Sequence, residues 1–362
     1  MKKTTILLGA GAMIPFGGPS TKTITDRLLI HKSCVDINTI VSEGYEEPCN
    51  FETILSSLEL LLEWNLSNDN TKHLTFRDTS IYRNVFQLGL PFQYYTTDKV
   101  WEIYKQVIND IIEVIKDYDY YPQYTGYRYG KDPAMLDMFI SKFQEDSNLK
   151  IYTLNYDRLI PNVIGNHLEI YEGIEGESYG YNLKKFTNHH LTYYNLHGSI
   201  YINYNLYTGI QLLDRPVELE DAIIMAGGNP NEQKIFLPII AGYHKSQRMM
   251  SQPFNFGLGS FMCDCDDCET IIIVGYSFSD PHINSILSNF IKTDNTKIII
   301  VDYSSDYVPS HSMIYTIKRV FKTKDKFVKV EDGVYRDTSN TITIFQKGFD
   351  IYIENYLYRI SR

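Results

Sequence analysis

The chain has 362 residues, 43% of them hydrophobic and 22% charged, so it can bury a sizeable core and has the composition of a globular protein. Its net charge of −10 excludes broad, sequence-independent nucleic-acid binding, which requires a surplus of Lys and Arg. No apolar run reaches the ~18 residues that a membrane span requires, and the five cysteines fit a reducing compartment. We therefore expect a cytoplasmic protein that binds neither nucleic acid nor membrane directly.

Short apolar runs without alternation predict strands that are buried on both faces. Such strands are typical of a parallel sheet covered by helices. We therefore expect an α/β fold with a Rossmann-like parallel sheet and helices on both faces, and residues 341–345 predict a further strand. The five runs are Thr4–Leu8, Ile151–Leu154, Tyr193–Leu196, Thr270–Val274 and Lys297–Val301.

Two long segments separate these strands. Residues 31–147 are mostly helical in pattern, because apolar residues between Tyr104 and Ile115 recur at intervals of three and four. Residues 166–260 are mixed and rich in loops. We expect one catalytic domain of residues 1–310 that contains both segments as insertions, and a C-terminal extension of residues 311–362 packed on it.

A polar or glycine-containing turn follows each predicted strand. Open parallel sheets bind ligands beyond the carboxyl ends of their strands, so these turns are candidate walls of one site. Glycines in the first turn would let the backbone approach a pyrophosphate. The dehydrogenase fingerprint fails, because its third glycine position is Ile14. The turns are Gly9-Ala10-Gly11-Ala12, Asn155-Tyr156-Asp157, His197-Gly198-Ser199, Gly275-Tyr276-Ser277 and Asp302-Tyr303-Ser304.

Each turn also has a purely structural interpretation. Asn155 and Asp157 could form an Asx turn with a helix cap, and His197 is either a core histidine or a general base. Asp280-Pro281 marks the start of a helix, since Asp is a good N-cap and Pro suits the first helical position. The N-terminus of that helix would face an anion such as a phosphate.

In combination, the order and spacing of these motifs resemble the sirtuin family over roughly residues 4–305. The sequences Asn-Tyr-Asp-Arg at 155–158 and Gly-Tyr-Ser-Phe-Ser-Asp-Pro-His at 275–282 look most like the sirtuin-like bacterial antiviral NADases. The paired Cys-x-x-Cys module of the deacylases has no counterpart here. The matching motifs are the Gly-Ala-Gly turn at 9–11, Thr-x-Asn-x-Asp at 153–157, His-Gly at 197–198, Gly-x-Ser at 275–277 and the polar residue at 302.

The resemblance implies an NAD⁺ hydrolase that releases nicotinamide and ADP-ribose, needs no metal, and acts as the toxic effector of an anti-phage, abortive-infection system. Asn155 would orient the ribose and the attacking water, and His197 would act as a base. Asp157 would contact the nicotinamide amide or stabilise the developing cation, while Asp302 would hold the adenosine ribose. The expected NAD-binding residues are Gly9, Ala10, Gly11, Ala12, Thr21, Gly275, Ser277 and Asp302.

An unregulated NADase would kill its host, so the resemblance also implies control by other molecules. We expect a homo-oligomer and a separately encoded regulatory partner, such as a HerA-like ATPase, a short Argonaute or another phage sensor. The tyrosine-rich segment 94–129 is the expected docking surface. Sequence leaves the trigger, the partner and the choice between hydrolysis and cyclisation open.

Three alternative functions remain open at this stage. The chain could be a sensor that binds NAD or ADP-ribose without catalysis, a sirtuin-type deacylase, or a serine hydrolase that uses Ser277 in an elbow-like turn. The cysteines at 263, 265 and 268 fit a helix face better than a zinc site, which commonly has four ligands in paired spacing.

Overall fold

The computed structural model describes most of the chain. The described residues are 2–42, 49–70, 97–119, 130–165, 167–174, 182–205, 209–219, 223–225, 233–235, 239–242, 245–250, 253–289 and 296–360. Most tyrosines of the expected docking surface, including Tyr94, Tyr95 and those at 120–129, lie outside these ranges, so that prediction is not addressed by the structure.

An eight-stranded sheet forms the centre of the molecule, in the order β10-β11-β12-β9-β8-β1-β2-β3. The strands from β12 to β3 pair in parallel, and β10 and β11 add an antiparallel edge. The six predicted strands are therefore confirmed, and the antiparallel edge was not predicted. The strands are β1 (Lys2–Leu8), β2 (Ser147–Thr153), β3 (Leu191–Asn195), β8 (Thr270–Val274), β9 (Lys297–Val301), β10 (Phe327–Glu331), β11 (Val334–Asp337) and β12 (Ile342–Phe345).

The register of the sheet brings the polar turns to one level. Leu8 of β1 pairs with Thr153 of β2 on one side and with Val274 of β8 on the other. Thr153 pairs in turn with Asn195 of β3. Because the strands are parallel and their last residues are in register, the segments that follow β1, β2, β3 and β8 leave the same edge of the sheet side by side.

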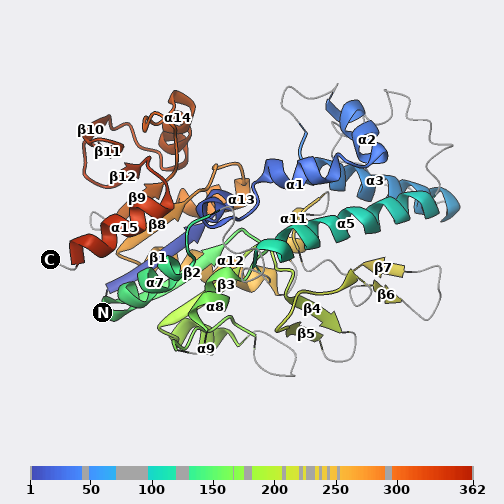
Figure 1. Ribbon diagram of the computed structural model, residues 1–362, viewed down its shortest axis with the longest axis horizontal. Coiled ribbons are helices and arrows are strands. Elements are labelled where there is room, and N and C mark those ends of the chain that lie inside the picture. The colour runs from blue at the N-terminus through green and yellow to red at the C-terminus, as the bar shows by residue number, and fades with distance from the viewer. Residues whose placement is uncertain are drawn as a thin grey trace.

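Helices cover both faces of the sheet, as the sequence predicts (Figure 1). One face packs on α7 (Ala134–Asp146), α8 (Leu159–Ile164) and α15 (Phe349–Ile360). The other packs on α9 (Leu183–Asn188), α12 (Phe254–Asp267), α13 (Pro281–Leu287) and α14 (His311–Val320). Ile6 and Leu7 of β1 are both buried and belong to these opposite cores, which explains the absence of alternation in the strand sequences.

A helical region extends beyond the carboxyl edge of the sheet (Figure 1). Its core is formed by α1 (Thr21–Leu28), α2 (Lys32–Ser42), α3 (Phe51–Asn70) and α5 (Thr97–Asp119). Val107, Ile111 and Ile115 of α5 are buried there, so the predicted apolar stripe is the packing face of a helix. Two short 3₁₀ turns, η1 (Ala10–Ala12) and η2 (Ile14–Phe16), connect β1 to this region.

Residues 166–260 contain two small hairpins in addition to α9, α12 and the short helix α11 (Lys245–Met249). The hairpins are β4 (Ile202–Asn205) with β5 (Gly209–Leu212), and β6 (Ile223–Met225) with β7 (Gln233–Ile235). Within the described ranges no helix combines the length and the hydrophobicity that a bilayer span requires. The proposed division into domains at residue 310 stays a prediction.

Candidate functional site

A cavity of about 360 Å³ lies at the carboxyl edge of the sheet, between the sheet and the helical region. Four of the five predicted turns contribute to its wall, as does the segment that leads into α1. Of the predicted site residues, those that line it are Gly9, Ala10, Gly11, Thr21, Asn155, Asp157, His197, Gly275 and Ser277. The sheet therefore brings together residues that are up to 268 positions apart in the sequence, from Gly9 to Ser277.

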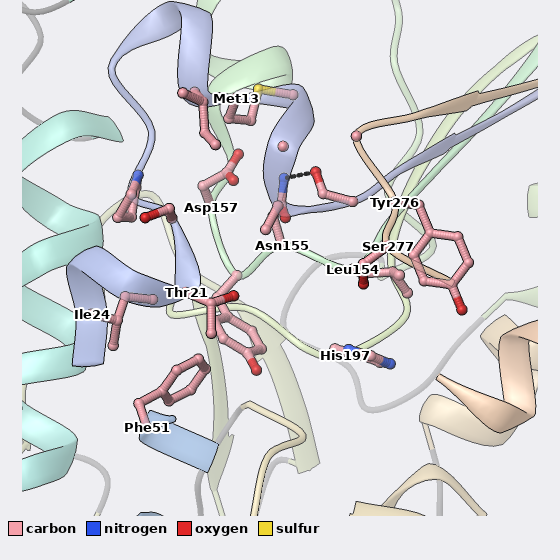
Figure 2. A pocket seen from close by; sticks show the side chains of 18 of the residues that line it. Met13, Thr21, Ile24, Phe51, Leu154, Asn155, Asp157, His197, Tyr276 and Ser277 are labelled. Carbon is pink, nitrogen blue, oxygen red and sulfur yellow. Dashed lines mark hydrogen bonds between the residues drawn. The ribbon is translucent and has the colours of Figure 1, made fainter. Parts of the chain in front are cut away.

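Asn155 has a fixed orientation in this cavity (Figure 2). Its side-chain Nδ2 donates to the main-chain carbonyl oxygen of Gly9 at 3.2 Å. The main-chain carbonyl oxygen of Asn155 accepts from Nδ2 of Asn195 at 3.0 Å. Because only an amide nitrogen can donate to the Gly9 carbonyl, the bond assigns the two ends of the amide and leaves Oδ1 as the acceptor for a ligand. The structure therefore shows no Asx turn made by the Asn155 side chain.

Asp157 is more tightly bound to the protein than the sequence suggests. Its side chain is buried, and Oδ1 accepts from the backbone N–H of Leu159 at 3.1 Å, which is an Asx turn. Burial and the nearby charge of Asp157 raise the pKa of Asp119 to about 8, and burial also raises the pKa of Asp157. At neutral pH the carboxyl groups of Asp119 and Asp157 together therefore carry less than two negative charges.

The glycines of the first and fourth turns pack directly against each other. A Cβ on Gly9 would lie 2.5 Å from the Gly275 carbonyl oxygen, and one on Gly275 would lie 2.2 Å from the amide nitrogen of Ala12. The N–H groups of Gly9 and Gly11 donate to the carbonyls of Val274 and Gly275. These glycines thus allow contact between two loops, and their amides are already used within the protein.

His197 lies at the bottom of the cavity with 4% of its surface exposed. Its Nε2 is 3.2 Å from Oδ2 of Asp280, although the angles between them are not those of a hydrogen bond. Burial lowers the pKa of His197, and the neighbouring carboxylate opposes this shift only in part. Nζ of Lys245 lies 3.3 Å from the same Asp280 oxygen and 3.3 Å from Oε2 of Glu52.

The expected anion site at the N-terminus of α13 is not available. Oδ1 of Asp280 accepts from the backbone N–H groups of His282 at 2.9 Å and Ile283 at 3.3 Å. The N-terminus is therefore occupied by the carboxylate of its own cap, and the prediction that it presents free amides is wrong. Burial would raise the pKa of Asp280, but His197 and Lys245 outweigh this and hold it well below the usual value.

A different helix N-terminus faces the cavity. Ser20 caps α1 by accepting from the N–H of Thr23 at 3.0 Å, and Ser20, Thr21 and Lys22 all line the cavity. On the opposite wall, the hydroxyls of Ser277 and Ser279 lie 2.9 Å apart. These groups could hold an anionic ligand between them.

Two predicted binding residues do not line the cavity. Ala12 is fully buried, and its N–H donates to the carbonyl of Gly9. Asp302 follows β9, beyond β8, where its N–H donates to the Phe345 carbonyl and its carbonyl accepts from Gly348. The cavity extends over the ends of β3, β2, β1 and β8, so a residue that follows β9 lies to one side of it.

The structure also bears on two alternatives raised from the sequence, a serine hydrolase that uses Ser277 and a zinc site at the cysteines. The Ser277 hydroxyl contacts that of Ser279, and within the described chain it makes no hydrogen bond with a histidine, which a serine nucleophile needs as its base. Cys263 and Cys265 lie in α12 as expected, and Cys268 caps it. The described residues contain no group of three or more His, Cys, Asp or Glu that could hold a metal ion.

Among the wall residues that sequence reasoning missed are the three charged residues that influence the pKa of His197: Glu52, Lys245 and Asp280. The sequence did predict Asp280 as a helix N-cap. An N-cap assignment does not say which side chain the second carboxylate oxygen contacts. Lys245 and Glu52 are 193 positions apart, and neither lies in a recognisable motif.

The chain matches no family model and no curated protein. Several solved sirtuin structures are similar to it over most of its length. A Sir2 homologue mutant in complex with 2′-O-acetyl ADP-ribose has 9% identity and a TM-score of 0.45, with 99% of this chain and 91% of that one covered. A Sir2 homologue–NAD complex has 12% identity and a TM-score of 0.41, with 88% and 89% covered. At such identity the similarity concerns the chain fold alone.

Proposed function

We propose that the protein is an NAD⁺ glycohydrolase that cleaves the bond between nicotinamide and ribose. The observation that carries this proposal is the convergence of a fixed amide, Asn155, and a buried imidazole, His197, on one cavity at the carboxyl edge of the sheet. Nicotinamide in NAD⁺ is a cationic leaving group, so the reaction needs no acid to protonate it. It needs a directed nucleophile and stabilisation of an oxocarbenium-like transition state.

Each proposed role follows from the position of the side chain. Oδ1 of Asn155, which the bond to Gly9 leaves unused, would accept a hydrogen bond from the attacking water or from a ribose hydroxyl. His197 is held neutral by burial and would accept the proton of that group. Asp157 would contact the nicotinamide amide or stabilise the positive charge that develops on the ribose.

The pyrophosphate would lie between the N-terminus of α1 and the Ser277 turn. Thr21 and Lys22 would supply backbone N–H groups at the start of α1, and the hydroxyls of Ser277 and Ser279 also lie in the wall of the cavity. The turn from Gly9 to Gly11 would then provide close approach and shape, since most of its amides are engaged. Asp302 would require a different arrangement to reach a ribose.

In the cell, such an activity fits the toxic effector of an anti-phage system, as the sequence resemblance implies. We propose that a separately encoded partner or self-assembly controls it, because uncontrolled NAD⁺ loss would be lethal. The partner's identity would follow from co-purification of the full chain with the products of neighbouring genes.

The test is NAD⁺ consumption by the full chain, followed by chromatography of NAD⁺, nicotinamide and ADP-ribose, in cells and in purified complexes. Asn155→Ala and His197→Ala should each reduce turnover by about 10²-fold or more, as expected for removal of a directing or general-base group. Matched controls are Asn148→Ala, at the other end of β2, and His190→Ala, an exposed residue just before β3. Both controls should retain activity.

Two results would count against the proposal. Full turnover by Asn155→Ala and His197→Ala would show that these residues do not carry the reaction. Tight NAD⁺ binding by wild-type protein without any consumption, in cells as well as in the purified complex, would favour a sensor.

A further inference from the structure

Next to His197 lies a carboxylate, that of Asp280, which has no role in the mechanism proposed above. Asp280 is as buried as His197, with 5% of each side chain exposed. Oδ2 of Asp280 and Nε2 of His197 are 3.2 Å apart, and neither makes a hydrogen bond elsewhere in the described chain. Both atoms are buried and close to each other without a hydrogen bond of good geometry, so this arrangement calls for a functional explanation. Catalytic hydrogen bonds are often misaligned before a ligand binds.

The two oxygens of Asp280 have separate partners. Oδ1 caps α13 through the N–H groups of His282 and Ile283, while Oδ2 faces His197. The backbone N–H of Asp280 donates to the hydroxyl of Tyr276 at 3.2 Å, which restricts the main chain as well. The carboxylate is therefore held in place by the backbone of α13 and by Tyr276, and it can in turn fix the imidazole.

Lys245 forms an ion pair with the same oxygen of Asp280. Its Nζ lies 3.3 Å from Oδ2 of Asp280 and 3.3 Å from Oε2 of Glu52. The charged groups that face His197 are therefore Asp280 from α13, Lys245 from α11 and Glu52 from α3. Tyr156 and Tyr276, which also line the cavity, are neutral because burial raises their pKa values.

We propose that Asp280 is a positioning residue for His197: one carboxylate oxygen fixes Nε2 of the imidazole while the other caps α13, and Lys245 balances the charge. With Nε2 turned toward Asp280, Nδ1 is the ring nitrogen left to accept the proton. The proton passes from water or a ribose hydroxyl to Nδ1, and Asp280 remains ionised beside the imidazolium that forms. This inference rests on the proposed function where it makes His197 the base.

Two substitutions should change His197 in opposite directions. Asp280→Asn keeps an oxygen that can cap α13 but removes the charge, so the pKa of His197 should fall. Lys245→Met removes the opposing positive charge, so the pKa should rise. A charge at this distance typically shifts a pKa by about 1–3 units, so both changes are measurable.

The experiment is an NMR titration of the full chain labelled with ¹³C-histidine, in which His197→Gln identifies the His197 signal. The pH profile of NAD⁺ turnover is measured in parallel. Asp280→Asn should lower kcat by about tenfold or more with little change in KM, and should move the acid limb of the profile to lower pH. Ser310→Ala removes the cap of α14, a residue that does not line the cavity, and should move neither the His197 signal nor the acid limb.

The outcomes separate this inference from the proposed function. If Asp280→Asn only lowers the unfolding temperature and leaves both the His197 pKa and the acid limb unchanged, Asp280 is a cap and the inference is wrong. If the titration shifts as expected but wild-type protein never consumes NAD⁺, the proposed function fails while the coupling between Asp280 and His197 stands.

Discussion

Gly275→Ala is the substitution that tests the contact between the two glycine-containing loops most directly. Gly275 has φ of +57°, a conformation that L-residues rarely adopt, and a methyl group there would lie 2.2 Å from the Ala12 nitrogen and 2.3 Å from the Gly11 carbonyl carbon. Both neighbours are backbone atoms, so a rotamer change cannot relieve the overlap. The cost should therefore include backbone strain and steric displacement together.

Gly165→Ala is the matched control. Gly165 has φ of +59° at the end of α8, but a methyl group there meets nothing within 4 Å. Its cost should be the conformational strain alone, about 1–3 kcal/mol. Gly275→Ala should cost about 1–3 kcal/mol more, the usual penalty for overpacking a close-packed region.

The assay is urea unfolding of both variants and wild type, followed by circular dichroism, with the free energy of unfolding taken from the midpoint and slope. The difference between the two variants isolates the steric part, because both residues have a similar φ. Equal destabilisation by the two substitutions would refute the loop contact. In that case the glycines would have to be explained by a ligand that approaches the backbone.

Two further predictions concern buried charges. The pKa of Asp119 is about 8 in the folded protein against an ordinary 3.8, so between these pH values the folded state holds an extra proton. The free energy of unfolding should therefore fall as pH rises from about 4 to about 8. Asp119→Asn should flatten this dependence, as measured by urea unfolding at about pH 5 and at about pH 8. An equally steep dependence in the variant would contradict this assignment. Arg248→Met should cost about 3–5 kcal/mol because it removes the guanidinium that lies 2.7 Å from the carboxylate of Glu59, whose side chain is 6% exposed. The control Arg215→Met, in an exposed pair with Glu218, should change stability by less than about 1 kcal/mol, and a similar loss in both variants would be evidence against a buried ion pair.

The buried elements of the fold could be predicted from the sequence alone. Strands such as β1 and β8 are buried on both faces, and their continuous apolar sequences predict both the parallel sheet and the edge at which the cavity lies. The edge strand β10 was missed because all but its first residue are exposed, including Val328 and Val330, so it has no one-sided pattern. Edge pairing of this kind is decided by neighbours in space and carries little local signal.

Side-chain partners within the site were less predictable than its position. Motif order indicates that Asn155 and His197 approach one cavity, but it does not indicate that the N-terminus of α13 is already occupied by its own cap. That outcome depends on a carboxylate with two oxygens, one directed into the helix and one toward His197. Lys245 reaches the same carboxylate from a loop-rich segment, where spacing and periodicity give no information about contacts.

The glycine contact also explains why the amide of Asn155 is oriented at all. Gly9 can approach Gly275 only because neither carries a side chain, and this approach determines where the Gly9 carbonyl points. That carbonyl accepts the amide hydrogen of Asn155, so its position decides which end of the amide faces the cavity. The contact between the first and fourth turns therefore helps to set the orientation of the second. Glycines that resemble a phosphate-binding motif can thus fix the geometry of a neighbouring strand end, with their own amides engaged in backbone hydrogen bonds.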